Sequence, residues 1–133
     1  MQKLSLSLLF MTLLFCTSCS QNPDVQGKWK NANGETLNFS TDSSVVLGQE
    51  GSEGGLEGRF TIDGDTVRIT TAPAMDDLGE FHNEFVLVAR DEKLQMVAVT
   101  LHRAGDFDTI SISELAKKLR KSEDEYAFKR MEK

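Results

Sequence analysis

Hydrophobic and polar residues alternate with a period of two through most of the chain after residue 24, a pattern typical of strands with one buried face. Gly, Asn and Asp residues interrupt the alternation at short intervals, as turns between antiparallel strands do. The pattern predicts eight strands, over residues 25–30, 35–40, 44–47, 56–62, 66–71, 81–90, 94–103 and 126–131. We therefore expect an all-β domain, an antiparallel meander that forms a small barrel or a half-open barrel.

Two predicted hairpins fix the expected register. Asp63-Gly64 forms a two-residue turn whose glycine can adopt the positive φ that such turns need, and this turn is expected to pair Phe60 with Val67. In the longer hairpin, of residues 81–90 and 94–103, the apolar faces match when opposed residue numbers sum to 184. A slip of one residue would move this apolar face to solvent, so the hydrophobic pattern specifies the register.

The same register makes specific pairs in the long hairpin. Phe85 is expected to face Val99, and Leu87 to face Val97, around a turn at residues 91–93. The opposite face pairs Glu84 with Thr100 and His82 with His102. Two imidazoles and a carboxylate are ligand types that zinc accepts, and adjacent imidazoles can sense pH. The set is incomplete and lies on the face assigned to solvent, so we expect no metal and no cofactor.

Residues 108–124 break the strand pattern and predict one short amphipathic helix before the last strand. Ser111 and Glu114 have the spacing of a capping box. The apolar positions recur at helical spacing at Ile112, Leu115, Ala116 and Leu119, and the other face carries Lys117, Lys118, Arg120 and Lys121. These cations can contact anionic lipid. The favoured interpretation is that they complement the negative carboxyl end of their own helix.

The amino-terminal segment has the features of a secretion signal. Lys3 precedes an apolar run over residues 4–15, which is too short for a permanent transmembrane helix. Small residues then precede Cys19, and this arrangement resembles a lipobox, with Cys16 where leucine is usual. We interpret residues 1–18 as a lipoprotein signal peptide, Cys19 as the lipid attachment site, residues 19–24 as a lipidated tether and residues 25–133 as the β domain. The alternative is an ordinary signal that leaves Cys19 as a free thiol.

Charge and composition argue against several classes of function for the mature chain. The formal net charge is −6, and removal of Lys3 leaves 14 basic and 21 acidic residues, a charge of −7. An acidic body repels phosphate backbones, which argues against nucleic acid and against electrostatic attachment to a membrane. With Cys19 acylated and Cys16 removed, the mature chain has no thiol, and it has no glycine-rich phosphate loop and no Gly-x-Ser-x-Gly elbow. Asp76-Asp77 is its clearest carboxylate pair. We expect no catalytic site.

Several segments together resemble the bacterial lipocalin-like lipoproteins of the calycin group. Gly27-Lys28-Trp29 has the Gly-x-Trp of the first lipocalin strand, and residues 36–39 and 60–67 resemble the second strand and a central hairpin. A late helix precedes a last strand that ends in Phe128-Lys129-Arg130. The resemblance implies a barrel in which Trp29 lies across the floor and Arg130 packs on its ring, a favourable contact of a cation with an aromatic face.

Two functions follow from this fold. The interior of an eight-stranded barrel is just wide enough for side chains or one small ligand. The first hypothesis is a membrane-anchored module that binds a small apolar ligand, lined by Trp29, Phe39, Phe60, Phe85 and Val99. The alternative is an envelope protein with a filled core that binds another protein, as an inhibitor or an assembly factor. By resemblance to proteobacterial sorting, Ser20 favours the outer membrane, with a monomeric domain in the periplasm.

Overall fold

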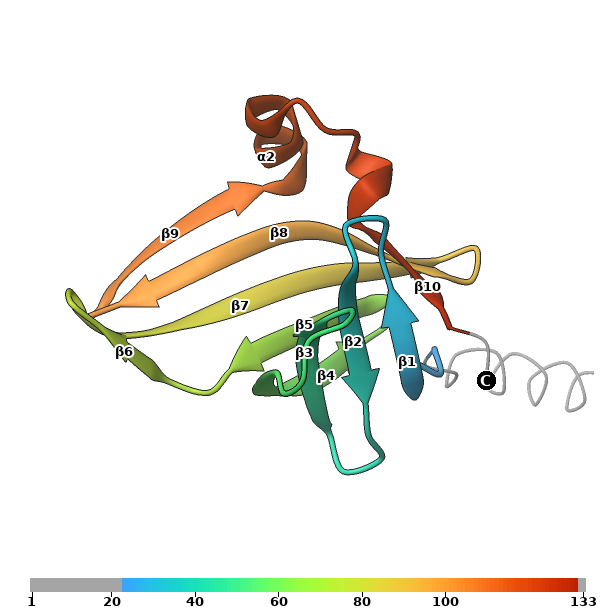
Figure 1. Cartoon of the computed structure of the whole chain (residues 1–133), viewed down its shortest axis with the longest axis horizontal. Helices are drawn as coiled ribbons and strands as arrows, with labels where there is room; N and C mark the ends of the chain where they lie inside the picture. The colour runs from blue at the N-terminus through green and yellow to red at the C-terminus, as the bar shows by residue number, and fades with distance from the viewer. Residues whose placement is uncertain (1–22, 132–133) are drawn as a thin grey trace, which may run out of the picture.

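The computed structural model describes residues 23–131 and shows an all-β fold with one short α-helix (Figure 1). Residues 1–18, which the sequence predicts to be a signal peptide, and Cys19 lie outside the described residues. The strands are β1 (Gly27–Lys30), β2 (Glu35–Phe39), β3 (Ser44–Gln49), β4 (Leu56–Asp63), β5 (Thr66–Thr71), β6 (Ala74–Asp76), β7 (Gly79–Arg90), β8 (Lys93–Arg103), β9 (Asp106–Ser111) and β10 (Ala127–Arg130). The helix α2 (Ile112–Leu119) and the 3-10 helix η1 (Glu123–Tyr126) lie between β9 and β10. The predicted fold class is confirmed.

Eight of the strands close into an antiparallel barrel. The order around the barrel is β1, β2, β3, β4, β5, β7, β8 and β10, and β10 pairs with both β8 and β1. The last strand therefore joins the first strand to the long β7–β8 hairpin. This closes the barrel, so the half-open form that the sequence also allowed is not the one observed.

The remaining two strands build an extension on the barrel. β7 and β8 have 12 and 11 residues and pair with each other along this length, and at the far end their outer edges pair with β6 and β9 instead of β5 and β10. We call this part, residues 74–83 and 100–109, the extension. Figure 1 shows it projecting to the left of the barrel, with β6 at its far end. The sequence pattern predicted neither β6 nor β9.

The register of the long hairpin agrees with the prediction in the extension and changes near the turn. Phe85 pairs with Val99 and His82 with His102, as the sum of 184 requires. Leu87, however, pairs with Met96 rather than with Val97, because a β-bulge follows Val86.

The turn explains this bulge. Asp91 and Glu92 alone form it, both with positive φ (51° and 62°), where the sequence predicted three residues. A two-residue turn shortens the hairpin by one position, and the bulge at Val97 restores the predicted register beyond it. Met96 is consequently 7% exposed and Val97 37% exposed, so the prediction that Val97 lines the apolar face is wrong.

The β4–β5 hairpin also differs from its predicted register, because its turn lies one residue later than expected. The turn residues are Gly64 and Asp65, and Asp63 already pairs with Thr66. This shift of one position places Ile62 opposite Val67. Phe60 therefore pairs with Ile69, and the predicted pair of Phe60 with Val67 is wrong.

Helix α2 packs on one side of the barrel through its apolar residues. Ser111 is the N-cap, and its Oγ accepts a hydrogen bond from the backbone N–H of Glu114 at 3.2 Å, at the position where the sequence predicted a cap. Ile112 and Ala116 are buried in the barrel core. None of the helices between residues 23 and 131 has the length and hydrophobicity that crossing a membrane requires.

Candidate functional site

The five residues predicted to line a ligand pocket all lie in or against the hydrophobic core. Trp29 and Phe39 are buried, whereas Phe60, Phe85 and Val99 are half-buried and pack against the core cluster. The rings of Phe39 and Phe60 meet edge to face, with centroids 4.9 Å apart. Side chains fill much of the interior, and the rest of the cluster is formed by Val25, Leu37, Val45, Val67, Ile69, Leu87, Leu94, Met96, Ile112, Ala116, Tyr126 and Phe128.

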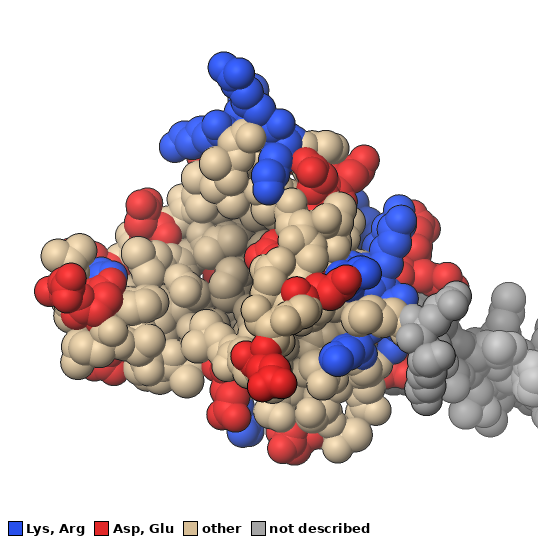
Figure 2. Space-filling view, viewed as in Figure 1, with Lys and Arg blue, Asp and Glu red and all other residues tan. Residues whose placement is uncertain are grey.

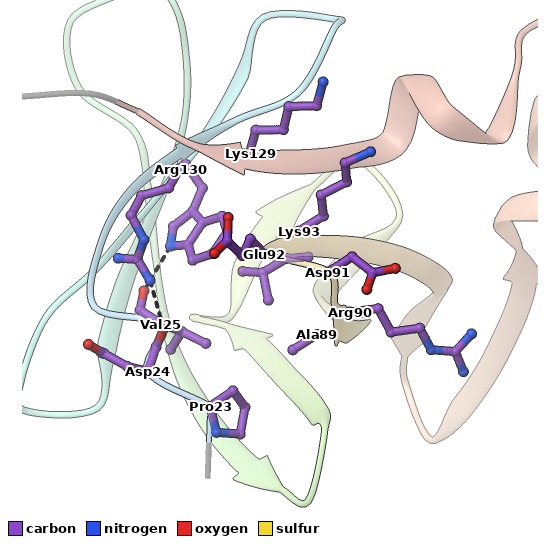
Figure 3. Close-up of a pocket in the computed structure, with 12 residues that line it drawn as sticks. Pro23, Asp24, Val25, Ala89, Arg90, Asp91, Glu92, Lys93, Lys129 and Arg130 are labelled. Carbon is purple, nitrogen blue, oxygen red and sulfur yellow. Dashed lines mark hydrogen bonds between the residues drawn. The ribbon is translucent and has the colours of Figure 1, made fainter.

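Trp29 closes one end of the barrel. Its Nε1–H donates a hydrogen bond to the Val25 carbonyl at 2.8 Å, and the Arg130 guanidinium lies 4.4 Å from the centre of its ring. Arg130 also donates to the Asp24 carbonyl at 2.7 Å (Figure 3) and to the Gln26 carbonyl. The contact that the resemblance implied between Trp29 and Arg130 is confirmed. A surface pocket of about 630 Å³ lies outside this plug, between the start of the described chain and the β7–β8 turn.

The two histidines meet across β7 and β8 as the register predicted. Their rings are stacked, with centroids 4.5 Å apart and an angle of 5° between the planes, and the Phe107 ring lies 6.1 Å from that of His102. The His102 Nε2 atom is buried and lies 3.6 Å from the Glu84 carboxylate, too far for a hydrogen bond. In the part of the chain that the structure describes, no group of three or more His, Cys, Asp or Glu side chains is placed to hold a metal.

Asp76, one of the two acidic residues weighed as a carboxylate pair, is held by Arg103. Both carboxylate oxygens accept hydrogen bonds from the guanidinium at 2.7 Å, and the guanidinium also lies 5.1 Å from the centre of the Phe81 ring. The hydrogen bonds from Arg103 lower the pKa of Asp76 to about 2. A carboxylate held ionised in this way has little basicity, so Asp76 is a structural element of the extension rather than a general base.

The far end of the extension carries three strongly exposed apolar side chains. Met75 is 74% exposed, Leu78 79% and Phe107 71%, the highest values for large apolar residues between residues 23 and 131. We call these three residues the apolar tip. Exposed acidic residues border it, at Asp77, Glu80, Asp106 and Asp108, and red atoms lie beside tan ones at the left end of the molecule in Figure 2. Single exposed apolar residues are common, and the three at this end of the molecule form a candidate contact surface.

A pocket of about 540 Å³ lies next to the apolar tip. Its lining includes Leu78, Phe81, His82, His102 and Arg103. The extension thus combines an apolar projection, an aromatic hollow and an acidic border in a part of the chain that the barrel does not need for closure.

In comparison with known proteins, the chain matches no protein-family model and shows no significant similarity to a curated protein or a solved structure. The fold and the site define its class, which is a small closed antiparallel β-barrel with one helix and a projecting four-stranded sheet.

Proposed function

We propose that this chain is a lipocalin-like lipoprotein of the outer membrane, anchored through Cys19, that binds another envelope protein through the apolar tip. The exposure of Met75, Leu78 and Phe107 at the end of the extension carries the proposal. Exposure of large apolar side chains to water is unfavourable in free energy, and a surface that covers them releases the water that hydrates them. A partner surface that covers them is therefore the simplest use of the extension.

The packing of the barrel supports this function over a ligand carrier. Core residues such as Val45, Val67, Ile69 and Leu87 are fully buried, and Trp29 with Arg130 plugs one end. An eight-stranded barrel filled in this way uses its interior for stability.

The position of the anchor supports it as well. Pro23, the first described residue, lies four positions after Cys19 and lines the surface pocket at the Trp29 end of the barrel. The extension lies at the opposite side of the molecule (Figure 1). A lipid on Cys19 would hold the Trp29 end close to the bilayer and leave the apolar tip pointing into the periplasm, where a partner can reach it.

The chemistry of the tip defines the kind of partner. Asp77, Glu80, Asp106 and Asp108 surround the apolar residues, and Arg103 is already held by Asp76. A complementary partner protein would therefore have a surface with an apolar centre and a border of Lys and Arg residues.

Site-specific photo-crosslinking in intact cells tests this function. A photoreactive amino acid in place of Phe107 or Leu78 should give a discrete adduct with one envelope protein, identified by mass spectrometry. The matched control is the same substitution at Leu119, which is 53% exposed on α2 and should give no such adduct. Equal adducts from the tip and from Leu119, or none from the tip, would contradict the proposal.

A small apolar ligand is the second candidate, and one observation favours it. Phe60, Phe85 and Val99 lie in one cross-strand row that faces the interior, yet they stay half-buried. Figure 2 shows the surface hollowed between α2 and the extension. Uptake of an apolar fluorescent probe that Phe85→Ala changes and Phe107→Ser leaves unchanged would favour this candidate over the first one.

A further inference from the structure

Four cations lie side by side on the barrel surface. Lys30 of β1 pairs with Lys129 of β10, Lys129 pairs with Lys93 of β8, and Lys93 pairs with Arg90 of β7. The closure of the barrel thus aligns four positive residues, far apart in the sequence, across four neighbouring strands. We call them the cation row.

All four side chains point away from the barrel core. Their neighbours along the chain are core residues or pack against the core, at Trp29, Phe128, Leu94 and Ala89, and alternate residues of a strand face opposite sides. Figure 3 shows Lys129, Lys93 and Arg90 extending to the same side, away from Val25.

The four positive charges of the cation row repel one another. Directly opposed residues of neighbouring strands have Cα atoms about 4.5–5.5 Å apart, and like charges at such positions repel. Lys30 has a partner, the Glu50 carboxylate at 2.8 Å. Within residues 23–131, Lys129, Lys93 and Arg90 make no ion pair within 4 Å, although Asp91 extends to the same side in Figure 3. Asp91 and Glu92 of the β7–β8 turn line the same surface pocket as these three cations, but neither forms an ion pair with them within the described residues.

We infer that the cation row binds phosphate groups of anionic phospholipids in the membrane that holds the Cys19 anchor. The inference rests on the lipid anchor of the proposed function. Arg90, Lys93 and Lys129 line the same surface pocket as Pro23, only four positions after Cys19. The tether therefore holds this side of the barrel within reach of the headgroups, where lysine and arginine attract an anionic surface.

The row orients the domain rather than anchoring it. The net negative charge opposes attraction of the whole domain to an anionic bilayer, whereas a local positive row next to the tether favours one orientation of a domain already held there. The extension projects away from that side, so this orientation presents the apolar tip to the periplasm (Figure 1).

The second basic cluster provides an internal control. Lys117, Lys118 and Lys121 belong to α2 or follow it, and blue atoms mark this helix at the top of the molecule in Figure 2. Their side chains do not line the pocket next to Pro23. The proposal therefore predicts that these lysines stay accessible when the cation row touches lipid.

The test uses the lipidated protein, purified from membranes and reconstituted in vesicles of phosphatidylcholine alone or with about one third phosphatidylglycerol. An amine-reactive reagent modifies exposed lysines, and mass spectrometry gives the rate at each one. We expect Lys93 and Lys129 to react about threefold more slowly in the anionic vesicles, and to recover in high salt. Equal rates in both vesicles, equal protection in both, or protection of Lys117 and Lys118 instead would overturn the inference.

A paired variant checks the row without relying on the mutated residues as reporters. In Lys93→Gln with Lys129→Gln, the protection of Lys30 by anionic lipid should disappear. In Lys117→Gln with Lys118→Gln, the matched control, it should persist. Protection of Lys30 that survives the first pair contradicts the inference.

If Cys19 carries no lipid, the experiment gives a different result from the one expected if the cation row does not bind anionic lipid. A protein without lipid would not float with vesicles of phosphatidylcholine, which would refute the role of Cys19, whereas a lipidated protein that floats but shows equal lysine rates in both vesicles would refute the cation row alone. Failure of the apolar tip to capture a protein partner changes neither measurement.

Discussion

The guanidinium of Arg130 lies over the indole ring of Trp29, 4.4 Å from its centre, and the two residues are direct partners across β1 and β10. These are the first and last strands of the barrel, so the contact lies on the seam where the barrel closes. Arg130 also donates to the Asp24 carbonyl at 2.7 Å and to the Gln26 carbonyl, which fixes the segment that leads into β1. One side chain thus joins both ends of the described chain.

Arg130→Ala should lower the free energy of unfolding by about 1–2 kcal/mol, because it removes the cation–aromatic contact and two hydrogen bonds. Arg130→Lys should lose less, since it keeps the charge. Urea unfolding followed by the fluorescence of Trp29 measures both. Lys129→Ala, at the neighbouring exposed position, should change stability by less than about 0.5 kcal/mol. An equal loss in Lys129→Ala would show that the seam depends on β10 as a whole.

Leu87→Ala should destabilise the barrel by about 2–5 kcal/mol, because Leu87 is fully buried and its truncation leaves a cavity. Val97→Ala, at the bulge and 37% exposed, should cost less than about 1 kcal/mol. The two variants, compared by urea unfolding, test the observed register directly. Similar large losses in both would favour the register without a bulge that the sequence predicted.

The sequence determines some features of this fold and not others. The alternation of apolar residues was enough for the all-β class, for most strands and for the pair of His82 with His102. It could not reveal the bulge at Val97, because a bulge depends on the number of residues in the turn, and alternation does not report that number.

The extension was missed for a related reason. β6 has only three residues, and β9 has only two apolar residues among its six, so neither has the sustained alternation that predicts a strand. Both are strands because the long β7 and β8 offer open edges. Leu78, between Asp77 and Gly79, and Phe107, between Asp106 and Asp108, were the available signals of the exposed tip.

The cation row also depends on closure. Its members are separated by up to 99 positions, from Lys30 to Lys129, and only the pairing of β10 with both β1 and β8 brings them together. Local charge patterns pointed to α2 instead, where four cations are close in sequence.

Asp76→Asn should reduce stability at neutral pH, and the difference from the unchanged protein should vanish in acid. The pKa of Asp76 falls from 3.8 to about 2 because Arg103 hydrogen-bonds its carboxylate, so the ionised form favours the folded state. This stabilisation is complete above about pH 4 and is lost as the pH falls through about 2. Urea midpoints at a series of pH values measure it, with Asp77→Asn as the control. A difference that stays constant down to pH 2 would argue against the ion pair.

Cys19→Ser should abolish incorporation of a labelled fatty acid and release the protein from the membrane fraction. The control is Cys16→Ser, which should leave both unchanged because the predicted cleavage would remove Cys16 with the signal peptide. Continued labelling of the Cys19 variant, or loss of labelling in the Cys16 variant, would contradict the assignment of the anchor.

Glu92→Gly should stabilise the barrel by about 0.5–1 kcal/mol. Asp91 and Glu92 both have positive φ in the two-residue turn, a conformation that glycine adopts without steric cost and glutamate does not. Part of the gain is offset, because glycine also makes the unfolded chain more flexible. Glu92→Ala is the matched control, since it removes the same charge and keeps the Cβ atom, and it should not stabilise. Thermal unfolding of the two variants separates the backbone effect from the charge, and a similar increase in both would assign the gain to electrostatics instead of to the turn.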